Sequence, residues 1–319
     1  MKADLHVHSY HSGYASHFRR LRARDSYSSP EAVYRTAKAR GMDLVCLTDH
    51  DSIDGCLEFL DAYPDATDFI MGEEIECAFP DVPDMRVHLG AIGMTERQHR
   101  EVQRLRPNAL DVAAFLRDER VFFAVNHLFF FYRASHLPLA DYLGRVLRLA
   151  PAVEIHNGAM LPAHNRLSAE LRAEAARRGR SLAVTGGSDA HTLQWVGTSF
   201  TEADGATREE FLAHVRSGRA RVGGVHGTLG RMTSEVYGVI LNYWRSLVGL
   251  ERSDLGLKDH FVSTACTLAL CVPAVVVPGI VAVTHKAREA RRVRECREAW
   301  ASDQSMPITP GATAALTGK

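Results

Sequence analysis

Histidine is the unusual side chain of this 319-residue sequence, which contains sixteen of them, several in short motifs. The first motif, DLHVHS, places His6 and His8 two residues apart within an expected strand. Strand side chains alternate between faces, so residues two apart share a face and both imidazoles can bind one metal ion. The motif GSDAH gives Asp189 and His191 the same spacing just after another expected strand. Both pairs therefore have the residue types and the spacing of metal ligands.

Similar side chains recur at or near the ends of seven expected strands. Packed together without a cation, these imidazoles and carboxylates would lose their hydration without compensation. We therefore interpret the whole set as one metal site. Its candidate members, in chain order, are His6, His8, Asp49, His50, Glu73 or Glu74, His88, His127, Glu154, Asp189 and His191.

The elements that must position these residues are apolar strands that alternate with amphipathic helices. This alternation favours a parallel sheet covered on both faces, or a barrel. In a barrel the carboxyl ends of the strands meet at one rim, where catalytic groups gather. The expected strands are 3–8, 42–48, 68–75, 85–93, 121–126, 152–156 and 181–185, and the expected helices are 30–41, 54–62, 108–120, 139–149, 163–178, 209–217 and 233–250.

The donor types indicate which metal is bound. Imidazole and carboxylate without thiolate suit Zn, Mn or Fe better than an all-oxygen Mg or Ca site. The candidates outnumber the four ligands of a single zinc, so we expect two or three ions bridged by a carboxylate and a water. Such clusters lower the pKa of bound water and stabilise attacking and leaving oxygens, which suits the hydrolysis of phosphate esters.

In this order, the motifs DLHVHS, TDHD, GEE, the lone His88, VNH, VEIHN and GSDAH resemble those of the PHP (polymerase and histidinol phosphatase) family. The resemblance covers about residues 3–225. It implies an α/β fold, a distorted (β/α)7 TIM-like barrel, with two to three divalent ions. It also implies phosphoesterase activity, in which a metal-bridged hydroxide attacks phosphorus. The implied ligands are His6, His8, Glu74 and Asp189 for one ion, Glu74 as a bridge with His88 and His127 for a second, and His50 and His191 with one further group for a third.

Two positions need separate treatment. The family pattern is Gly-x-Glu, so the ligand is Glu74 and not Glu73, which faces the other way on the strand. The family's further ligand for the third ion follows the second His of HxH by five or six residues, where this chain has Gly13 and Tyr14. The candidate replacements in the following loop are His11, His17 and Asp25.

The remaining candidates have less specific roles. We expect Asp49 to act with Glu74 and His191 in catalysis by orienting a ligand, and a simple turn role is the alternative. Glu154 orients a ligand or accepts a hydrogen bond from substrate. A phosphate needs positive charge beyond the metals, and the candidate side chains are Arg19, Arg20 and Arg133. The alternative, which is the more common role of an arginine in a loop, is a solvated surface charge.

Composition limits the partners and the compartment. Lys plus Arg and Asp plus Glu are 38 each, so no net positive field draws the chain to nucleic acid. Six cysteines without a CxxC pair, and a polar start without an apolar run, predict reduced thiols, no signal peptide and a cytoplasmic location. The expected substrate is a small phosphorylated molecule, and nucleotides and short oligonucleotides are among the candidates. The alternatives are a non-catalytic regulatory or membrane-localised metal-binding scaffold, and a metal-dependent hydrolase of C–N bonds.

The C-terminal part differs from the rest in composition. Residues 261–284 carry no charge, and residues 286–297 are strongly basic. A membrane-surface anchor on anionic lipid and a buried or self-associating apolar hairpin are the two alternatives. The expected divisions are a hydrolase barrel (1–225), a helical extension (226–260), the apolar and basic segment (261–302) and a flexible tail (303–319).

Overall fold

The computed structural model describes residues 1–15, 23–250, 264 and 273–302. Strands and helices alternate through most of this length, as the apolar pattern predicts. In chain order the elements are β1 (Lys2–Asp4), α1 (Pro30–Ala39), β2 (Leu44–Leu47), α2 (Asp54–Ala62), β3 (Phe69–Phe79), β4 (Val82–Ile92), α3 (Glu96–Leu105), α4 (Ala109–Asp118), β5 (Phe122–Val125), α5 (Leu139–Leu149), β6 (Ala152–Asn157), α6 (Pro162–Arg177), β7 (Ala183–Gly187), β8 (Ser199–Glu202), α7 (Arg208–Arg216), β9 (Arg221–Gly224), α8 (Leu229–Leu247) and α10 (Pro273–Ser302).

The strands form one nine-stranded sheet in the order β7-β6-β5-β4-β3-β2-β1-β8-β9. The sheet nearly closes on itself, because the chain just beyond β1 pairs with the chain just beyond β7. The amide of Asp189 donates to the carbonyl of His6 (2.6 Å), and the amide of His8 donates to the carbonyl of Ala190 (3.1 Å). The fold is therefore mixed α/β with a barrel-like sheet, and the motifs DLHVHS and GSDAH lie side by side.

The sheet departs from a simple repeat of strand and helix at β4. This strand runs antiparallel to both β3 and β5, and β3 and β4 form a hairpin in which Glu76 pairs with His88. In the described residues no helix separates these two strands. The antiparallel direction explains how His88, in the middle of β4, reaches the height of the side chains that end the parallel strands.

Three elements were not expected from the sequence: helix α3 and the short antiparallel strands β8 and β9. Helix α3 has mostly polar residues, half of all its residues are charged, and only Gln98 and Val102 are buried. Its start carries a local signal, however, because Thr95 and Gln98 form a capping box. The strands β8 and β9 have four residues each, with glycine in β9, so they lack a clear apolar alternation.

The interior of the sheet has an apolar floor and a polar upper layer. Side chains from β1 to β7 meet in one apolar cluster, and Phe211 of α7 closes it from below. Along β3 the same face carries Ile70, then Gly72 and then Glu74, because side chains repeat every two residues. Period-two alternation therefore places acidic and imidazole groups directly above a packed apolar layer.

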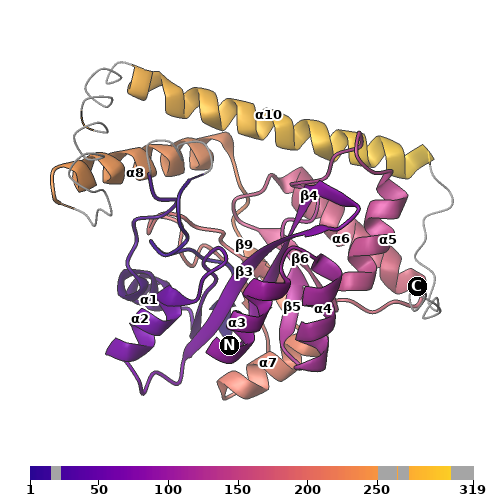
Figure 1. The fold of residues 1–319 in the computed structure, drawn as a ribbon, viewed down its shortest axis with the longest axis horizontal. Coiled ribbons are helices and arrows are strands. Elements are labelled where there is room, and N and C mark those ends of the chain that lie inside the picture. The colour runs from indigo at the N-terminus through magenta and orange to yellow at the C-terminus, as the bar shows by residue number, and fades with distance from the viewer. Residues whose placement is uncertain (16–22, 251–263, 265–272, 303–319) are drawn as a thin grey trace.

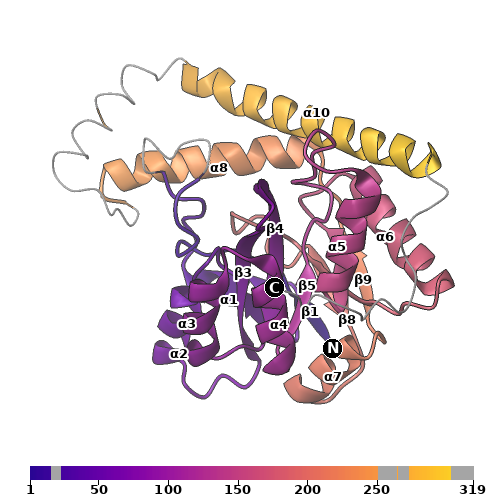
Figure 2. The same cartoon turned by 45° about the vertical axis from the view of Figure 1, so that its right-hand side comes forward.

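Helices α8 and α10 lie across the open rim of the sheet, with α10 outermost (Figures 1 and 2). Helix α10 contains Pro278 within its length. Nearly all of the proposed membrane segment before residue 273, and the tail 303–319, lie outside the described residues. Among the helices of the described ranges, none has both the length and the apolar composition needed to cross a bilayer.

Candidate metal centre

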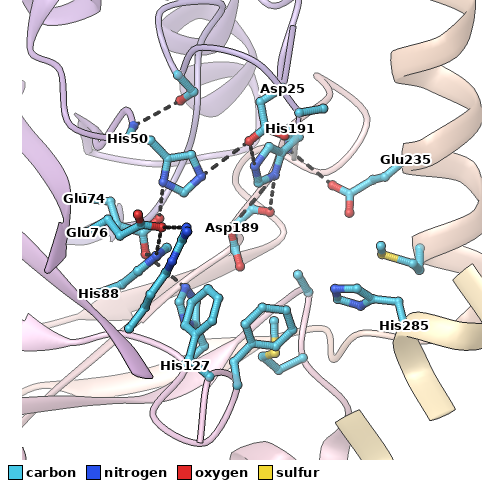
Figure 3. A pocket seen from close by; sticks show the side chains of 18 of the residues that line it. Asp25, His50, Glu74, Glu76, His88, His127, Asp189, His191, Glu235 and His285 are labelled. Carbon is cyan, nitrogen blue, oxygen red and sulfur yellow. Dashed lines mark hydrogen bonds and ion pairs between the residues drawn. The ribbon is translucent and has the colours of Figure 1, made fainter. Parts of the chain in front are cut away.

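Glu74 stands at the centre of the candidate site (Figure 3). It is fully buried on the inward face of β3, in the middle of the strand, and its two oxygens approach imidazoles from five different positions of the chain. A ring nitrogen of each of His50, His88 and His127 lies 3.0–3.1 Å from a carboxylate oxygen of Glu74. His6 and His8 lie at 3.2 and 3.6 Å. One carboxylate is thus shared by five potential ligands, which is the position that a bridging ligand requires.

Asp189 is the second carboxylate of the cluster. Its Oδ1 lies 3.5 Å from His6 Nε2 and 3.4 Å from His8 Nε2. The two histidines of the HxH motif therefore face Glu74 and Asp189 together, as the spacing predicts. Groups of side chains that could share one ion include His6, His8 and Glu74, and also His6, His127 and Asp189.

A third group of side chains lies beside these. His191 Nε2 is 2.9 Å from Asp25 Oδ2, and His50 Nε2 is 3.4 Å from the same oxygen. Asp25 is thus the candidate that meets His50 and His191. His11 instead pairs with Glu58 at 2.9 Å, away from the cluster. His17 lies outside the described residues.

The cluster has opposite charges at very short range. Burial disfavours the charged form of Glu74, but the imidazoles of His6, His88, His127 and His50 hold its pKa well below the usual range. Burial also opposes a proton on His6, yet Glu74, Asp189 and Glu154 raise its pKa well above the usual range. His8 behaves differently, because burial and the neighbouring His191 and His50 lower its pKa to about 3. A neutral imidazole at His8 keeps a lone pair available for a cation.

Buried nitrogen atoms test whether these residues fit a metal. His6 Nε2 and His8 Nε2 are buried and form no hydrogen bond among the described residues, although carboxylate oxygens surround them. A buried polar atom without a partner costs free energy that a bound cation would offset. The donor set, imidazole and carboxylate without thiolate, is that of Zn, Mn or Fe sites. The residues present therefore fit divalent transition-metal ions.

Buried carboxylates hold the imidazole rings in place from outside the cluster. Glu154 accepts from His6 Nδ1 (2.8 Å) and from the His127 amide (2.8 Å). Asp49 accepts from Ser12 Oγ (2.7 Å), which is itself 2.9 Å from His8 Nδ1. Neither Asp49 nor Glu154 lines the cavity above the cluster. Such contacts are the kind by which a carboxylate orients a histidine, which is the part that the sequence predicts for Asp49 and one of the two that it predicts for Glu154.

Glu73 and Glu74 face opposite sides of β3, as the Gly-x-Glu interpretation requires. Glu73 accepts from Gln103 Nε2 (2.6 Å) and lies 2.8 Å from His99 Nδ1, both on α3. It is fully buried on the far side of the strand from the cluster. His156, which the alternation places off the site, likewise lies 3.2 Å from the Val225 carbonyl.

The backbone around the site is specialised. His127 and Asp189 have φ of 27° and 52°, in the left-handed region that costs free energy for side chains other than glycine. Gly90 lies below Asn126, and a Cβ on Gly90 would stand 2.8 Å from the Asn126 amide oxygen. Asn126 needs that space because its Nδ2 donates to Glu74 Oε1 (2.9 Å). Asn126 was missed by the sequence analysis, although it precedes His127 in VNH.

A cavity of about 670 Å³ opens above the cluster and is lined by His50, Glu74, His88, His127 and His191. Its walls include residues that the sequence analysis missed, such as Glu76 next to His88 and Glu235 of α8. The expected phosphate-binding residue Arg133 also lines it. Arg19 and Arg20 lie outside the described residues.

Fold and site together define an α/β protein with a histidine–carboxylate cluster at the rim of a barrel-like sheet. Residues 168–220 match a family model described as PHP-associated. This stretch runs from α6 to α7 and contains Asp189 and His191. The match confirms the resemblance to the PHP family.

Comparisons with individual proteins give either a short match or a low sequence identity. Over 58 residues, 18% of this chain, the sequence is 41% identical to an uncharacterized protein of Methanocaldococcus jannaschii, of which the match spans 33%. PsfC from Pseudomonas syringae has 18% identity and a TM-score of 0.47, with 77% of this chain and 98% of that chain covered. An amidohydrolase from Chromobacterium violaceum has 17% identity and a TM-score of 0.46, covering 69% and 97%. The lesion-specific endonuclease PfuEndoQ from Pyrococcus furiosus has 19% identity and a TM-score of 0.45, covering 69% and 57%.

Proposed function

We propose that this protein is a metal-dependent phosphoesterase that hydrolyses a phosphate mono- or diester. The observation that carries the proposal is the convergence of five imidazoles on the buried carboxylate of Glu74 beneath an open cavity. Divalent ions held there supply Lewis acidity, which lowers the pKa of water and neutralises phosphate oxygens. The protein residues supply the fixed positions. We propose Zn, Mn or Fe ions at three places: His6, His8, Glu74 and Asp189; Glu74, His88 and His127; and His50, His191 and Asp25.

The group of His50, His191 and Asp25 can act in two ways, depending on whether it holds a proton or a metal ion. Burial opposes a proton on His191, but Asp25 raises the His191 pKa to about 9, so the free pair holds a proton at neutral pH. Where the pair holds that proton, His191 would donate it to the leaving oxygen, since its side chain lines the cavity. Where the pair holds an ion, His191 is a ligand instead. Asp25 positions the ring in both cases.

The proposal also assigns the parts of the chain. Residues 1–225, with β1 to β7 as the distorted (β/α)7 barrel, form the hydrolase domain. Helices α8 and α10 belong to the C-terminal extension (226–302), and they pack across the rim of the barrel (Figure 2). Small phosphorylated molecules, nucleotides and short oligonucleotides are the proposed substrates.

The test is an activity screen with added Mn or Zn. The substrates are 4-nitrophenyl phosphate, bis(4-nitrophenyl) phosphate and, for C–N bonds, 4-nitroacetanilide. We expect metal-stimulated release of nitrophenol from a phosphate ester and none of nitroaniline, with activity lost on chelation. Cleavage of the anilide alone would identify a C–N hydrolase. Full metal loading without turnover of any substrate would contradict catalysis and favour a metal-binding scaffold.

A further inference from the structure

The cavity above the metal cluster is roofed by helices that lie far along the chain from most of the candidate ligands. Figure 3 shows Glu235 of α8 and His285 of α10 across the cavity from His88 and His127. A volume of about 670 Å³ is in the range of pockets that hold a whole small-molecule ligand. The roof therefore contacts the part of a substrate that lies beyond the reacting phosphate.

One face of α10 points into this cavity. The residues of α10 that line it are spaced four, three and four apart, which is one stripe along a helix. They are Val281, His285, Arg288 and Arg292.

The neighbouring stripe of α10 fixes the helix to the barrel. Lys286 Nζ lies 2.8 Å from Glu289 Oε2, and both side chains are buried. Glu289 also accepts from the Leu161 amide (2.6 Å), and Lys286 donates to the Ala159 carbonyl. Ala159 follows β6 and itself lines the cavity. The lining residues of α10 are thus presented by an anchored element.

Three of the arginines that line the cavity come from α10 and from the loop after β5. Arg288 and Arg292 come from α10, and Arg133 follows β5. Arg292 donates to the Phe130 carbonyl. Burial and then the charges of Arg133 and Arg288 lower the Arg292 pKa to about 10, because both positive charges act on the Arg292 guanidinium.

These arginines have little compensating negative charge. Glu289 and Glu295 are the carboxylates near Arg292, but they pair with Lys286 and with Arg291 (2.7 Å). Within the described part of the chain, no carboxylate forms an ion pair with Arg133 or Arg288. The other cavity arginines differ, since Arg86 pairs with Glu76 (2.5 Å) and Arg106 with Asp51. Uncompensated arginines beside a cavity are the arrangement that binds an anion.

A single aromatic ring separates the arginines from the metal cluster. The Phe130 ring lies 5.5 Å from the His127 ring, and the Arg292 guanidinium lies 5.4 Å from the Phe130 ring centre. The cavity lining also includes apolar side chains, among them Phe131 from the loop after β5 and Val239 from α8. A ligand that contacts both the arginines and the metal cluster therefore needs an apolar or planar middle.

We propose that Arg133, Arg288 and Arg292 form a second anion site, and that the substrate carries a second anionic group joined to the scissile phosphate through a planar or apolar spacer. The statement about substrate rests on the proposed phosphoesterase function. The site itself is a property of the cavity and binds anions whether or not turnover occurs.

The test compares two probes that differ in one charge, phenyl phosphate and 4-carboxyphenyl phosphate. The variant is Arg288→Gln, because Arg288 is exposed and forms no hydrogen bond or ion pair with the other described residues. The control is Arg294→Gln, an exposed arginine of the same helix outside the cavity. We expect Arg288→Gln to lower the ratio of kcat/KM for the carboxylated over the plain ester by about tenfold, the loss typical of one charge-assisted bond. Arg294→Gln should leave the ratio unchanged.

Binding of the matching phosphonates, measured by calorimetry on the metal-loaded protein, separates this inference from the proposed function. If neither ester is hydrolysed but wild type prefers 4-carboxyphenylphosphonate and Arg288→Gln loses that preference, the anion site stands and the phosphoesterase proposal falls. No preference in wild type, or equal changes in both variants, would overturn the second anion site.

Discussion

Glu73 and Glu74 are adjacent and chemically identical, yet they lie in different surroundings. Glu74 faces five imidazoles inside the sheet, and Glu73 faces His99 and Gln103 on the outside. Both are fully buried, so exposure does not distinguish them. The pair therefore allows a comparison at the level of a single residue.

We predict that Glu74→Gln and Glu73→Gln have different effects. Glu74→Gln removes a shared negative charge at nearly constant size, so metal content and phosphoesterase rate should fall, the rate by at least about a hundredfold. Glu73→Gln keeps metal and most activity, and lowers the free energy of unfolding by about 1–3 kcal/mol because a buried polar network is disturbed. Metal analysis, rates and urea unfolding give the comparison. Equal losses, or the reverse order, would contradict the assignment of Glu74 as the bridge.

Sequence reasoning finds most candidate ligands because they lie at strand ends with period-two spacing. It does not find Asn126 or Glu235, because their positions at the site depend on tertiary packing. Asp25 was one of three candidates for the third ion, and only the fold brings it to His50 and His191. For Asp49 the sequence predicts an orienting part, and the fold places its carboxylate 2.7 Å from Ser12 Oγ, which lies 2.9 Å from His8 Nδ1.

At the level of elements, α10 differs most from the expectation. Its uncharged and then basic residues left two alternatives open, a membrane-surface anchor and a buried or self-associating apolar hairpin. In the described part, buried residues such as Val293 and Cys296 pack on the barrel core, and Arg288 and Arg292 line a cavity. Composition alone does not distinguish the two roles of such a helix. Apolar and basic residues suit a helix on a membrane surface, and they equally suit a helix that packs on the protein with one face and binds anions with another.

We predict that the buried Lys286–Glu289 pair holds α10 on the barrel. Glu289→Gln leaves the Lys286 ammonium buried without its partner, so the free energy of unfolding should fall by about 3–5 kcal/mol. The control, Glu295→Gln, breaks the exposed pair with Arg291 and should cost about 0–1 kcal/mol. Denaturant unfolding measures both, and limited proteolysis reports release of α10. Similar costs for the two variants would show that the buried pair does not anchor the helix.

The α/β class, the strands that carry the site and most helix boundaries follow from apolar periodicity. Helices α2 and α5 begin and end at the expected residues. The antiparallel direction of β4 does not follow, because strand direction depends on the connection and Val82 follows Phe79 through a tight turn. The capping box of α3 was available in the sequence, whereas β8 and β9 were too short and polar to detect.

Considered as a whole, the molecule combines a barrel-like sheet that presents the candidate metal ligands with C-terminal helices that lie across its rim (Figure 2). The apolar floor under Glu74 and the helices above it exclude solvent on two sides. Under the two proposals, bound metal ions supply the positive charge at one end of the cavity, and arginine side chains supply it at the other. The metal cluster would hold the reacting phosphate, and the arginines of α10 and the loop after β5 would hold the rest of the substrate.

The most direct test of the central claim is the metal content of wild-type protein. The protein is purified without chelator, reconstituted with Mn or Zn, freed of excess metal and measured by elemental analysis. Because Glu74 is shared by imidazoles from several strands, at least two transition-metal equivalents per chain should remain bound. The Glu74→Gln variant should retain fewer. One equivalent or none in the reconstituted wild-type protein would contradict a multinuclear metal centre and the mechanism built on it.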